Sequence, residues 1–500
     1  PCMLELYIQF DQKGPATAML RLLITLLLTY WCFLAPTNLA LAKEIELPLL
    51  GDSSSGIVSK QQEYQLGRTW LKVFRSRVTE HDDPLMQLYF EELIYNLAVF
   101  SDLENPELEL VIIKNPTMNA FAVPGGVVGI HTGLFAFAEN EDQMVSVLAH
   151  ELAHLSQRHF ARGLEARRSS SMVTLAGLLA GLVVAATVGG DAGMAAISAS
   201  QAYAAESQLR YSRSNEQEAD RIGLQTMERS GRDPAAAGDM FETLLSKTRY
   251  SGTRIPEFLL THPVTEKRIA DARGRSMGSS RRHYIEHPDY YLMQARAIVA
   301  MDSSTKISIT KFQTELKNNT LRPDAANYGL ALAYLNAGEF IKAERLIAAL
   351  LAEHPRQIAY QYTDIEIDLA QENYATALSK LNGLLALTPN NYPLMALESE
   401  ILWQDHQYEK SATVLTLLTR NRPEDPMLWY RLAEVRGLAG NISGVHEARA
   451  EYFILVGAFD LAREQLGLAT KLVTADFKRS AIVSQRLRDV VSMEEKAKRL

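Results

Sequence analysis

A five-residue stretch at residues 150–154 has the pattern His-Glu-x-x-His. His150 and His154 are four positions apart, so on a helix they lie one turn apart on one face and can reach a single tetrahedral Zn²⁺. Glu151 projects at a neighbouring angle, where it can act on a water molecule as a general base. Apolar residues around the pattern recur at helical spacing: Met144, Val147, Leu148 and Leu155. The alternative is a chance match in a surface helix.

A catalytic zinc site needs a third protein ligand, and two places in the sequence are candidates. A histidine six positions after the motif is excluded because Phe160 stands there, and we expect His159 to be a solvated helix residue. The second place is a Glu-x-x-x-Asp pattern, in which Glu216 and Asp220 share one helix face. Glu216 can then bind the metal while Asp220 orients a ligand histidine. Glu218 would lie on the opposite, solvated side.

The elements that hold these residues are predicted from the spacing of apolar residues. Helical spacing predicts two helices over 60–103, and a further helix that begins near Glu139, where acidic residues suit a first turn. Apolar runs separated by Pro and Gly turns predict short strands at 108–113, 120–123 and 127–130. We therefore expect a mainly α protein whose N-terminal part also contains a small sheet.

The C-terminal third of the chain repeats itself with a period of 34 residues. Three independent columns keep this period: Pro355, Pro389 and Pro423; Ala343, Ala377 and Ser411; Phe340, Tyr374 and Tyr408. A 34-residue period with a small residue early in the second helix and Pro at its end is typical of tetratricopeptide repeats. Helices before Pro323 and after Gly440 are expected to extend the array to four or more pairs. A plain helical bundle is the alternative.

These motifs together resemble peptidase family M48, in the gluzincin branch of zinc metallopeptidases, where HExxH is followed by ExxxD. The resemblance implies an α+β metalloprotease domain in which His150, His154 and Glu216 bind one Zn²⁺ per chain. It also implies that Glu151 is the general base. Residues 119–126 (Asn-Ala-Phe-Ala-Val-Pro-Gly-Gly) resemble the family's strand beside the active site.

A Thr-His-Pro sequence centred on His262 also matches a subfamily of M48, in which this histidine lies near the metal. From the residues alone, His262 is either a ligand or oxyanion partner, or a structural residue at a helix N-terminus. The resemblance implies a regulatory fourth ligand that blocks water in the resting state. Arg268 either stabilises a developing oxyanion or forms a surface ion pair. Three further histidines have no partner at metal-ligand spacing and are expected to be structural: His131, His283 and His287.

Composition excludes several classes of protein. The chain has 51 basic and 59 acidic residues and a net charge of −8, which argues against nucleic-acid binding. Its two cysteines, Cys2 and Cys32, precede residue 43, so a disulfide scaffold and a cysteine-ligated metal are excluded.

The first 42 residues have the pattern of a secretory signal peptide. Arg21 supplies a positive charge, residues 22–34 are largely apolar, and Ala-Leu-Ala at 40–42 is a cleavage site. A buried N-terminal helix is the alternative. Because Pro1 cannot be an initiator, we expect residues 1–18 to be an upstream extension. The mature chain would be exported to the periplasm.

A second long apolar segment covers residues 169–190 and contains no charge. Its length would suit a transmembrane helix. One crossing, however, would place Glu216 on the opposite side of the bilayer from the two histidines of the motif, and one ion cannot be shared across it. We therefore expect a helical hairpin near the cleft, buried or acting as a lid, with at most peripheral membrane contact.

These features predict four parts in order: a signal peptide (1–42), a metalloprotease domain (43–271), an Arg-rich flexible linker or solvated loop (272–288) and a tetratricopeptide array (289–500). This order resembles periplasmic M48 proteases of Gram-negative bacteria. The resemblance implies, as partners, unfolded or misassembled outer-membrane β-barrel proteins and the barrel assembly machinery. The rival hypothesis is a non-proteolytic tetratricopeptide adaptor or chaperone with a structural or latent zinc site. The intact Glu151 favours an enzyme, because a structural site needs no base there.

Overall fold

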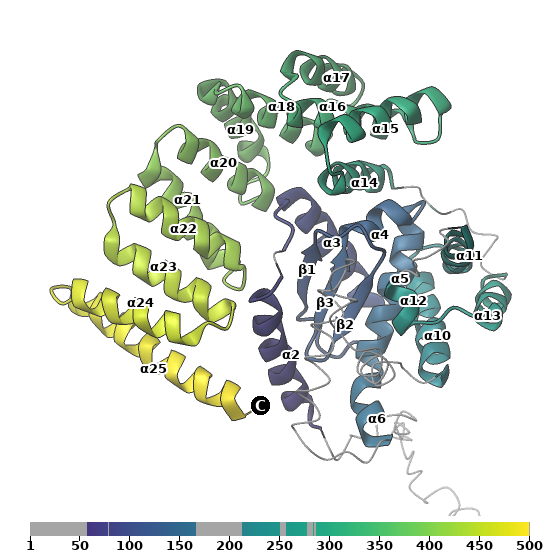
Figure 1. Ribbon diagram of the computed structural model, residues 1–500, viewed down its shortest axis with the longest axis horizontal. Coiled ribbons are helices and arrows are strands. Elements are labelled where there is room, and N and C mark those ends of the chain that lie inside the picture. The colour runs from purple at the N-terminus through teal and green to yellow at the C-terminus, as the bar shows by residue number, and fades with distance from the viewer. Residues whose placement is uncertain are drawn as a thin grey trace, which may run out of the picture. The chain divides into compact units, whose positions relative to one another are not determined.

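The structure is a computed structural model that describes residues 58–78, 80–166, 213–250, 257–277, 284 and 287–499 (Figure 1). The predicted signal peptide at 1–42 and the apolar segment at 169–190 lie outside the described residues. Within the described part, no helix combines the length and the apolar character needed to cross a bilayer. Helices dominate around one small sheet, which confirms the prediction of a mainly α protein.

The N-terminal part contains the sheet and the predicted motifs. Its elements are α2 (Lys60–Arg75), α3 (Pro84–Phe100), β1 (Glu109–Ile113), β2 (Ala120–Val123), β3 (Val127–His131), α4 (Thr132–Phe137), α5 (Glu141–Ser156), α6 (His159–Ala166), α10 (Arg213–Arg229), α11 (Ala235–Tyr250), α12 (Glu257–Thr261) and α13 (Glu266–Ser276). Both helices predicted over 60–103 and all three strands are present.

The strands pair in the order β1-β3-β2. β1 runs parallel to β3, whereas β2 is antiparallel to β3 and pairs Ala120 with Ile130. Among the described strands, β2 therefore lies at one edge of the sheet. The helix α5 packs against β2 and against α10, α11 and α3. It begins where the Asn140 side chain accepts a hydrogen bond from the Gln143 backbone N–H, with Glu141 and Asp142 in its first turn.

The C-terminal part is a succession of antiparallel helix pairs (Figure 1). Its elements are α14 (Pro288–Met301), α15 (Thr305–Asn318), α16 (Pro323–Asn336), α17 (Phe340–Glu353), α18 (Ile358–Ala370), α19 (Tyr374–Leu387), α20 (Tyr392–Gln404), α21 (Tyr408–Asn421), α22 (Pro426–Leu438), α23 (Ile442–Leu455), α24 (Phe459–Leu472) and α25 (Phe477–Arg499).

The 34-residue period corresponds to these pairs. The three aromatic residues of the period, Phe340, Tyr374 and Tyr408, open α17, α19 and α21, and each of these helices ends two residues before a proline of the period. The small residues Ala343, Ala377 and Ser411 are fully buried, because a larger side chain there would hold neighbouring helices apart. The repeat prediction is confirmed.

The segment that we predicted as the start of the linker has a different structure. α13 continues to Ser276, so residues 272–276 form its last turn and not a loop. Ala272 is buried, and the Arg273 guanidinium contacts Asp239 at 2.6 Å and Glu242 at 2.9 Å on α11. Charge and small residues suggested a solvated connection, but here they form the outer face of a packed helix. The domain boundaries themselves stay a prediction.

The two parts share one apolar core, which runs from Leu85 on α3 to Ile401 on α20. A buried ion-pair network crosses the same boundary. Arg296 on α14 donates from Nε to Asp83 Oδ2 at 2.7 Å, and its Nη1 lies 3.3 Å from Glu366 Oε2 on α18. Asp83 also caps α3, because its Oδ1 accepts from the N–H groups of Leu85 and Met86. Arg296 thus joins the repeat array to the first turn of α3.

We expect Arg296→Met to lower the free energy of unfolding by about 3–5 kcal/mol, because it leaves the Asp83 and Glu366 carboxylates without their buried counter-charge. Urea unfolding followed by circular dichroism measures the change. The matched control is Arg229→Met. Arg229 and Asp102 form an ion pair in which both side chains are exposed, so its loss should cost less than about 1 kcal/mol. Equal losses in the two variants would contradict a special contribution of Arg296.

Candidate metal centre

Four elements contribute the side chains of the predicted site. α5 carries His150, Glu151 and His154, α10 carries Glu216 and Asp220, the turn after α12 carries His262, and α13 carries Arg268. α10 lies close against α5 because of Gly223. A Cβ at this position would stand 3.2 Å from the backbone nitrogen of His150, closer than most side chains tolerate. The glycine therefore lets the two motif-bearing helices approach each other.

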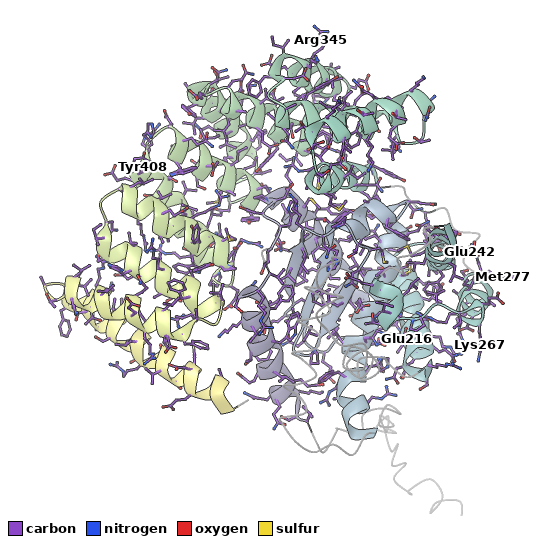
Figure 2. All side chains as sticks on the ribbon, in the orientation of Figure 1. Glu216, Glu242, Lys267, Met277, Arg345 and Tyr408 are labelled. Atoms are coloured by element: carbon purple, nitrogen blue, oxygen red, sulfur yellow. The ribbon has the colours of Figure 1, made fainter. Side chains whose placement is uncertain are left out.

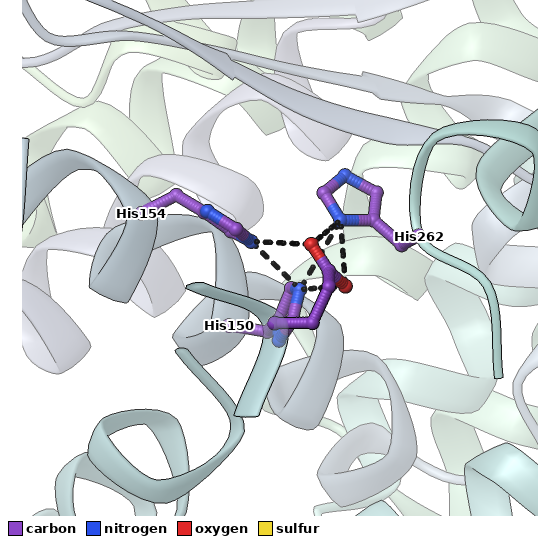
Figure 3. Close-up of side chains that lie close together, drawn as sticks. His150, His154 and His262 are labelled. Atoms are coloured by element: carbon purple, nitrogen blue, oxygen red, sulfur yellow. Dashed lines mark hydrogen bonds and ion pairs between the residues drawn. The ribbon is translucent and has the colours of Figure 1, made fainter. Parts of the chain in front are cut away.

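Three imidazoles and one carboxylate converge between these elements (Figure 3). One donor atom from each of His150, His154, Glu216 and His262 lies within 4.8 Å of the other three, and all four side chains are buried. His154 Nε2 is 3.0 Å from His150 Nε2 and 3.4 Å from Glu216 Oε1. His262 Nδ1 is 3.1 Å from Glu216 Oε1 and 3.3 Å from His150 Nε2.

This donor set fits a divalent metal ion. Imidazole nitrogens that face one another in a buried site need a cation or a proton between them, since their lone pairs repel. Three imidazole nitrogens and a carboxylate oxygen are ligands that Zn²⁺ accepts in tetrahedral sites. The chemistry of the cluster is thus that of a metal centre.

Asp220 and Arg268 form a layer behind the ligands. Asp220 Oδ1 lies 3.0 Å from His150 Nδ1, and the Arg268 guanidinium holds Asp220 through Nε at 2.7 Å and Nη2 at 2.6 Å. Arg268 Nη1 is also 3.0 Å from Glu216 Oε2. The surface ion pair that we weighed for Arg268 is wrong, because the side chain is buried between α10 and α13. Its N–H groups are directed at carboxylates and at the Pro263 carbonyl.

The protein groups alone set distinct protonation preferences. Burial disfavours a charged His150, but the contacts with Asp220 and Glu216 outweigh it and raise its pKa to about 9. Burial lowers the pKa of His154 well below its usual range. Burial opposes ionisation of Glu216, yet His262, His150 and His154 hold its pKa far below that of a free carboxyl. Glu216 is therefore an anion.

Glu151 differs from Glu216 in its surroundings. Its side chain is buried, its Oε1 lies 3.5 Å from His262 Nε2, and burial raises its pKa. It interacts with the backbone of Ala122 on the edge strand β2. The carboxylate therefore stands between the histidine cluster and the edge of the sheet.

Our expectation that His159 is solvated is wrong. The side chain is fully buried, with Nδ1 2.8 Å from His154 Nδ1 and Nε2 3.2 Å from Glu218 Oε2. Glu218 is half-buried and also accepts from Arg162 Nη1 at 3.0 Å. Two features of the sequence could have indicated this contact. His159 stands five positions after His154, and Glu218 lies between Glu216 and Asp220.

Two of the three histidines that we expected to be structural, His131 and His287, lie apart from the cluster. His131 is buried at the end of β3, where its Nδ1 lies 2.9 Å from Thr117 Oγ1, and burial lowers its pKa to about 4. His287 precedes α14, with Nδ1 3.5 Å from Glu141 Oε2. His283 lies outside the described residues.

Comparison with known proteins agrees with this geometry. The family model described as "Peptidase family M48" matches residues 84–276, which include every side chain of the cluster. The beta-barrel assembly-enhancing protease of Escherichia coli (strain K12) is 33% identical over 453 residues, which cover 90% of this chain and 92% of that protein. A putative beta-barrel assembly-enhancing protease of Vibrio cholerae is 32% identical over 448 residues, which cover 88% of this chain and 92% of that protein.

A more distant similarity covers the N-terminal part. The mitochondrial metalloendopeptidase OMA1 of Schizosaccharomyces pombe is 31% identical over 190 residues, 36% of this chain and 50% of that protein. The similarity to the bacterial proteases, in contrast, runs through the repeats as well. Because it extends over 90% of the chain at 33% identity, this protein belongs to peptidase family M48 and is a metallopeptidase.

Proposed function

We propose that this chain is a zinc endopeptidase of the periplasm that degrades unfolded or misassembled outer-membrane β-barrel proteins and promotes the assembly of competent ones. The names of its relatives from Escherichia coli and Vibrio cholerae support the link to barrel assembly. The pattern of a signal peptide cleaved after Ala42 supports export.

One observation carries the proposal of peptide hydrolysis: a buried carboxylate, Glu151, stands beside the ligand cluster and next to the edge strand β2. When bound, Zn²⁺ lowers the pKa of a coordinated water to about 7 and polarises a peptide carbonyl. Glu151 accepts a proton from the attacking water and delivers it to the leaving amine. Burial raises the pKa of Glu151, which makes it a stronger base for this transfer.

The remaining residues of the cluster hold this base and the ligands in place. Asp220 fixes the ring of His150, and Arg268 fixes both Asp220 and Glu216, so we assign Arg268 a positioning role. An oxyanion role for Arg268 would require it to leave these carboxylates. His262 lies within ligand distance and also 3.5 Å from Glu151, and we propose that it blocks the attacking water in the resting state.

Substrate would bind as an extended strand against β2, the edge strand among the described strands. Backbone hydrogen bonds supply affinity in such a complex without requiring particular side chains, which suits a protease that must accept many sequences. Barrel proteins expose strands of this kind only before their sheets close.

The repeat array faces the N-terminal part across a cavity of about 590 Å³ that is lined by residues of both parts. We propose that the array captures substrates and the barrel assembly machinery.

The test compares one barrel protein in two states. Purified zinc-loaded enzyme should cleave an outer-membrane β-barrel protein that is kept unfolded, and should leave the same protein intact once it is folded into phospholipid vesicles, because cleavage needs an opened chain. A chelator should stop cleavage and added zinc should restore it. Cleavage products are followed by gel and mass spectrometry. Failure to cut the unfolded barrel, or equal cutting of both states, would contradict the proposal.

A further inference from the structure

We infer that His159 and Glu218 form a relay behind the metal centre that fixes the ring and the tautomer of His154. The inference rests on the proposed function, because it treats His154 as a metal ligand. It assigns a positioning role in metal binding to two residues that neither the HExxH nor the ExxxD pattern specifies.

Three side chains contact one another in succession: His154, His159 and Glu218. His154 directs Nε2 at the ligand cluster and Nδ1 at His159 Nδ1, 2.8 Å away. His159 directs its other nitrogen, Nε2, at Glu218 Oε2, 3.2 Å away. His159 is fully buried, so its two ring nitrogens have these partners in a site closed to bulk water. Arg162 Nη1, 3.0 Å from Glu218 Oε2, supplies a positive charge beside the carboxylate.

The direction of the hydrogen bonds follows from what His154 must do. Nε2 of His154 needs a free lone pair to bind a metal, so the proton of this neutral ring is on Nδ1. His154 Nδ1–H then donates to His159 Nδ1, which must be unprotonated. The proton of His159 is therefore on Nε2, from which it donates to Glu218. A single assignment satisfies all three groups, and the carboxylate at the end stabilises it.

The two histidine ligands of α5 are then supported in parallel ways. His150 has the carboxylate of Asp220 directly at its Nδ1, at 3.0 Å. His154 reaches the carboxylate of Glu218 through the ring of His159. Both carboxylates come from α10, so the helix that carries the ligand Glu216 also fixes the tautomers of both histidines.

A break in the helix brings His159 to this place. On an uninterrupted helix, five positions correspond to a rotation of about 140°, and the ring would point away from His154. Instead α5 ends at Ser156, Arg158 adopts φ of 50°, and α6 begins at His159. The Arg158 side chain secures this left-handed residue, because its Nε donates to Glu63 at 2.8 Å and its Nη2 to the Val58 carbonyl at 2.8 Å.

The test measures metal affinity and needs no substrate. Loss of a partner that orients a metal-bound histidine lowers metal affinity by about 10–100-fold. We expect this loss for His159→Phe and for Glu218→Ala, measured by competition for Zn²⁺ with a chromophoric chelator. Glu218→Gln should retain more of the affinity than Glu218→Ala, because its amide oxygen still accepts from His159. The control, His446→Phe, removes a histidine of the repeat array that bonds Gln465, and should keep wild-type affinity.

A double-mutant cycle separates a relay from two independent packing effects. In a relay, the double variant His159→Phe/Glu218→Ala should lose no more affinity than His159→Phe alone, because Glu218 acts only through His159. The visible spectrum of the Co²⁺-substituted protein should change in His159→Phe, since the ring of His154 is no longer fixed. If His159→Phe does not fold, the pair Glu218→Ala and Glu218→Gln carries the test.

The outcomes distinguish the inference from the proposed function. Wild-type affinity and an unchanged Co²⁺ spectrum in folded His159→Phe, or additive losses in the double variant, would overturn the relay. Equal affinities for the Ala and Gln variants at Glu218 would overturn it as well. Wild-type protein that binds no zinc would instead overturn the metal centre, and with it the proposed function.

Discussion

Glu151→Gln is expected to lower kcat/KM for an unfolded barrel substrate by at least about 10²–10⁴-fold, while the protein keeps its zinc. An amide has nearly the shape of a carboxylate but cannot accept a proton from the attacking water, so the step that Glu151 performs is lost. Metal binding survives because the ligands proposed here are other residues of α5 and α10. Cleavage rates together with zinc content by mass spectrometry test both statements.

The matched control for this variant is Glu242→Gln. This substitution also replaces a carboxylate with an amide, but on the outer side of α11, away from the cluster in which Glu216 lies (Figure 2). It should cleave like wild type. Loss of zinc from Glu151→Gln would mean that Glu151 is a ligand and not the base. If neither wild type nor the variant cleaves, and both promote barrel assembly, the adaptor hypothesis would replace the proposed function.

The parts of this structure that follow from short-range periodicity could be predicted from the sequence. Two histidines four positions apart need only one helical turn to converge, and Glu216 with Asp220 needs only another. The repeats were predictable for a similar reason, because each column keeps one kind of residue (proline, small or aromatic) at a fixed place in its pair of helices.

The parts that depend on helix breaks and on packing between distant segments could not be predicted. His159 turns toward His154 only because Arg158 has a left-handed conformation that is secured by Glu63 and Val58, far away in sequence. An arginine is usually found at the protein surface, but Arg268 is buried because it pairs with two carboxylates of α10, Glu216 and Asp220. The strand order β1-β3-β2 likewise arises from pairing between segments, which alternation along one strand does not specify.

Glu216→Gln is expected to lower zinc affinity by more than the loss of a residue that only orients a ligand, which costs about 10–100-fold. Cleavage should be lost together with the zinc. Glu216 is the one anion among the four donor groups, and Arg268, His262 and His150 hold its carboxylate ionised. A neutral amide gives a weaker ligand and leaves the Arg268 guanidinium with one fewer buried counter-charge. Zinc content after dialysis and chelator competition measure the loss.

Comparison with Glu218→Gln makes this result specific, because Glu218 stands two positions further on the same helix and bears the same side chain. Glu216→Gln should lose far more zinc affinity than Glu218→Gln. Glu216 binds the ion, whereas Glu218 acts on it only through the rings of His159 and His154. Thermal unfolding in the presence of chelator checks that both variants fold. Undiminished zinc in Glu216→Gln would remove the carboxylate from the ligand set. The cluster would then be three imidazoles, and Glu216 would act as the anion that balances Arg268.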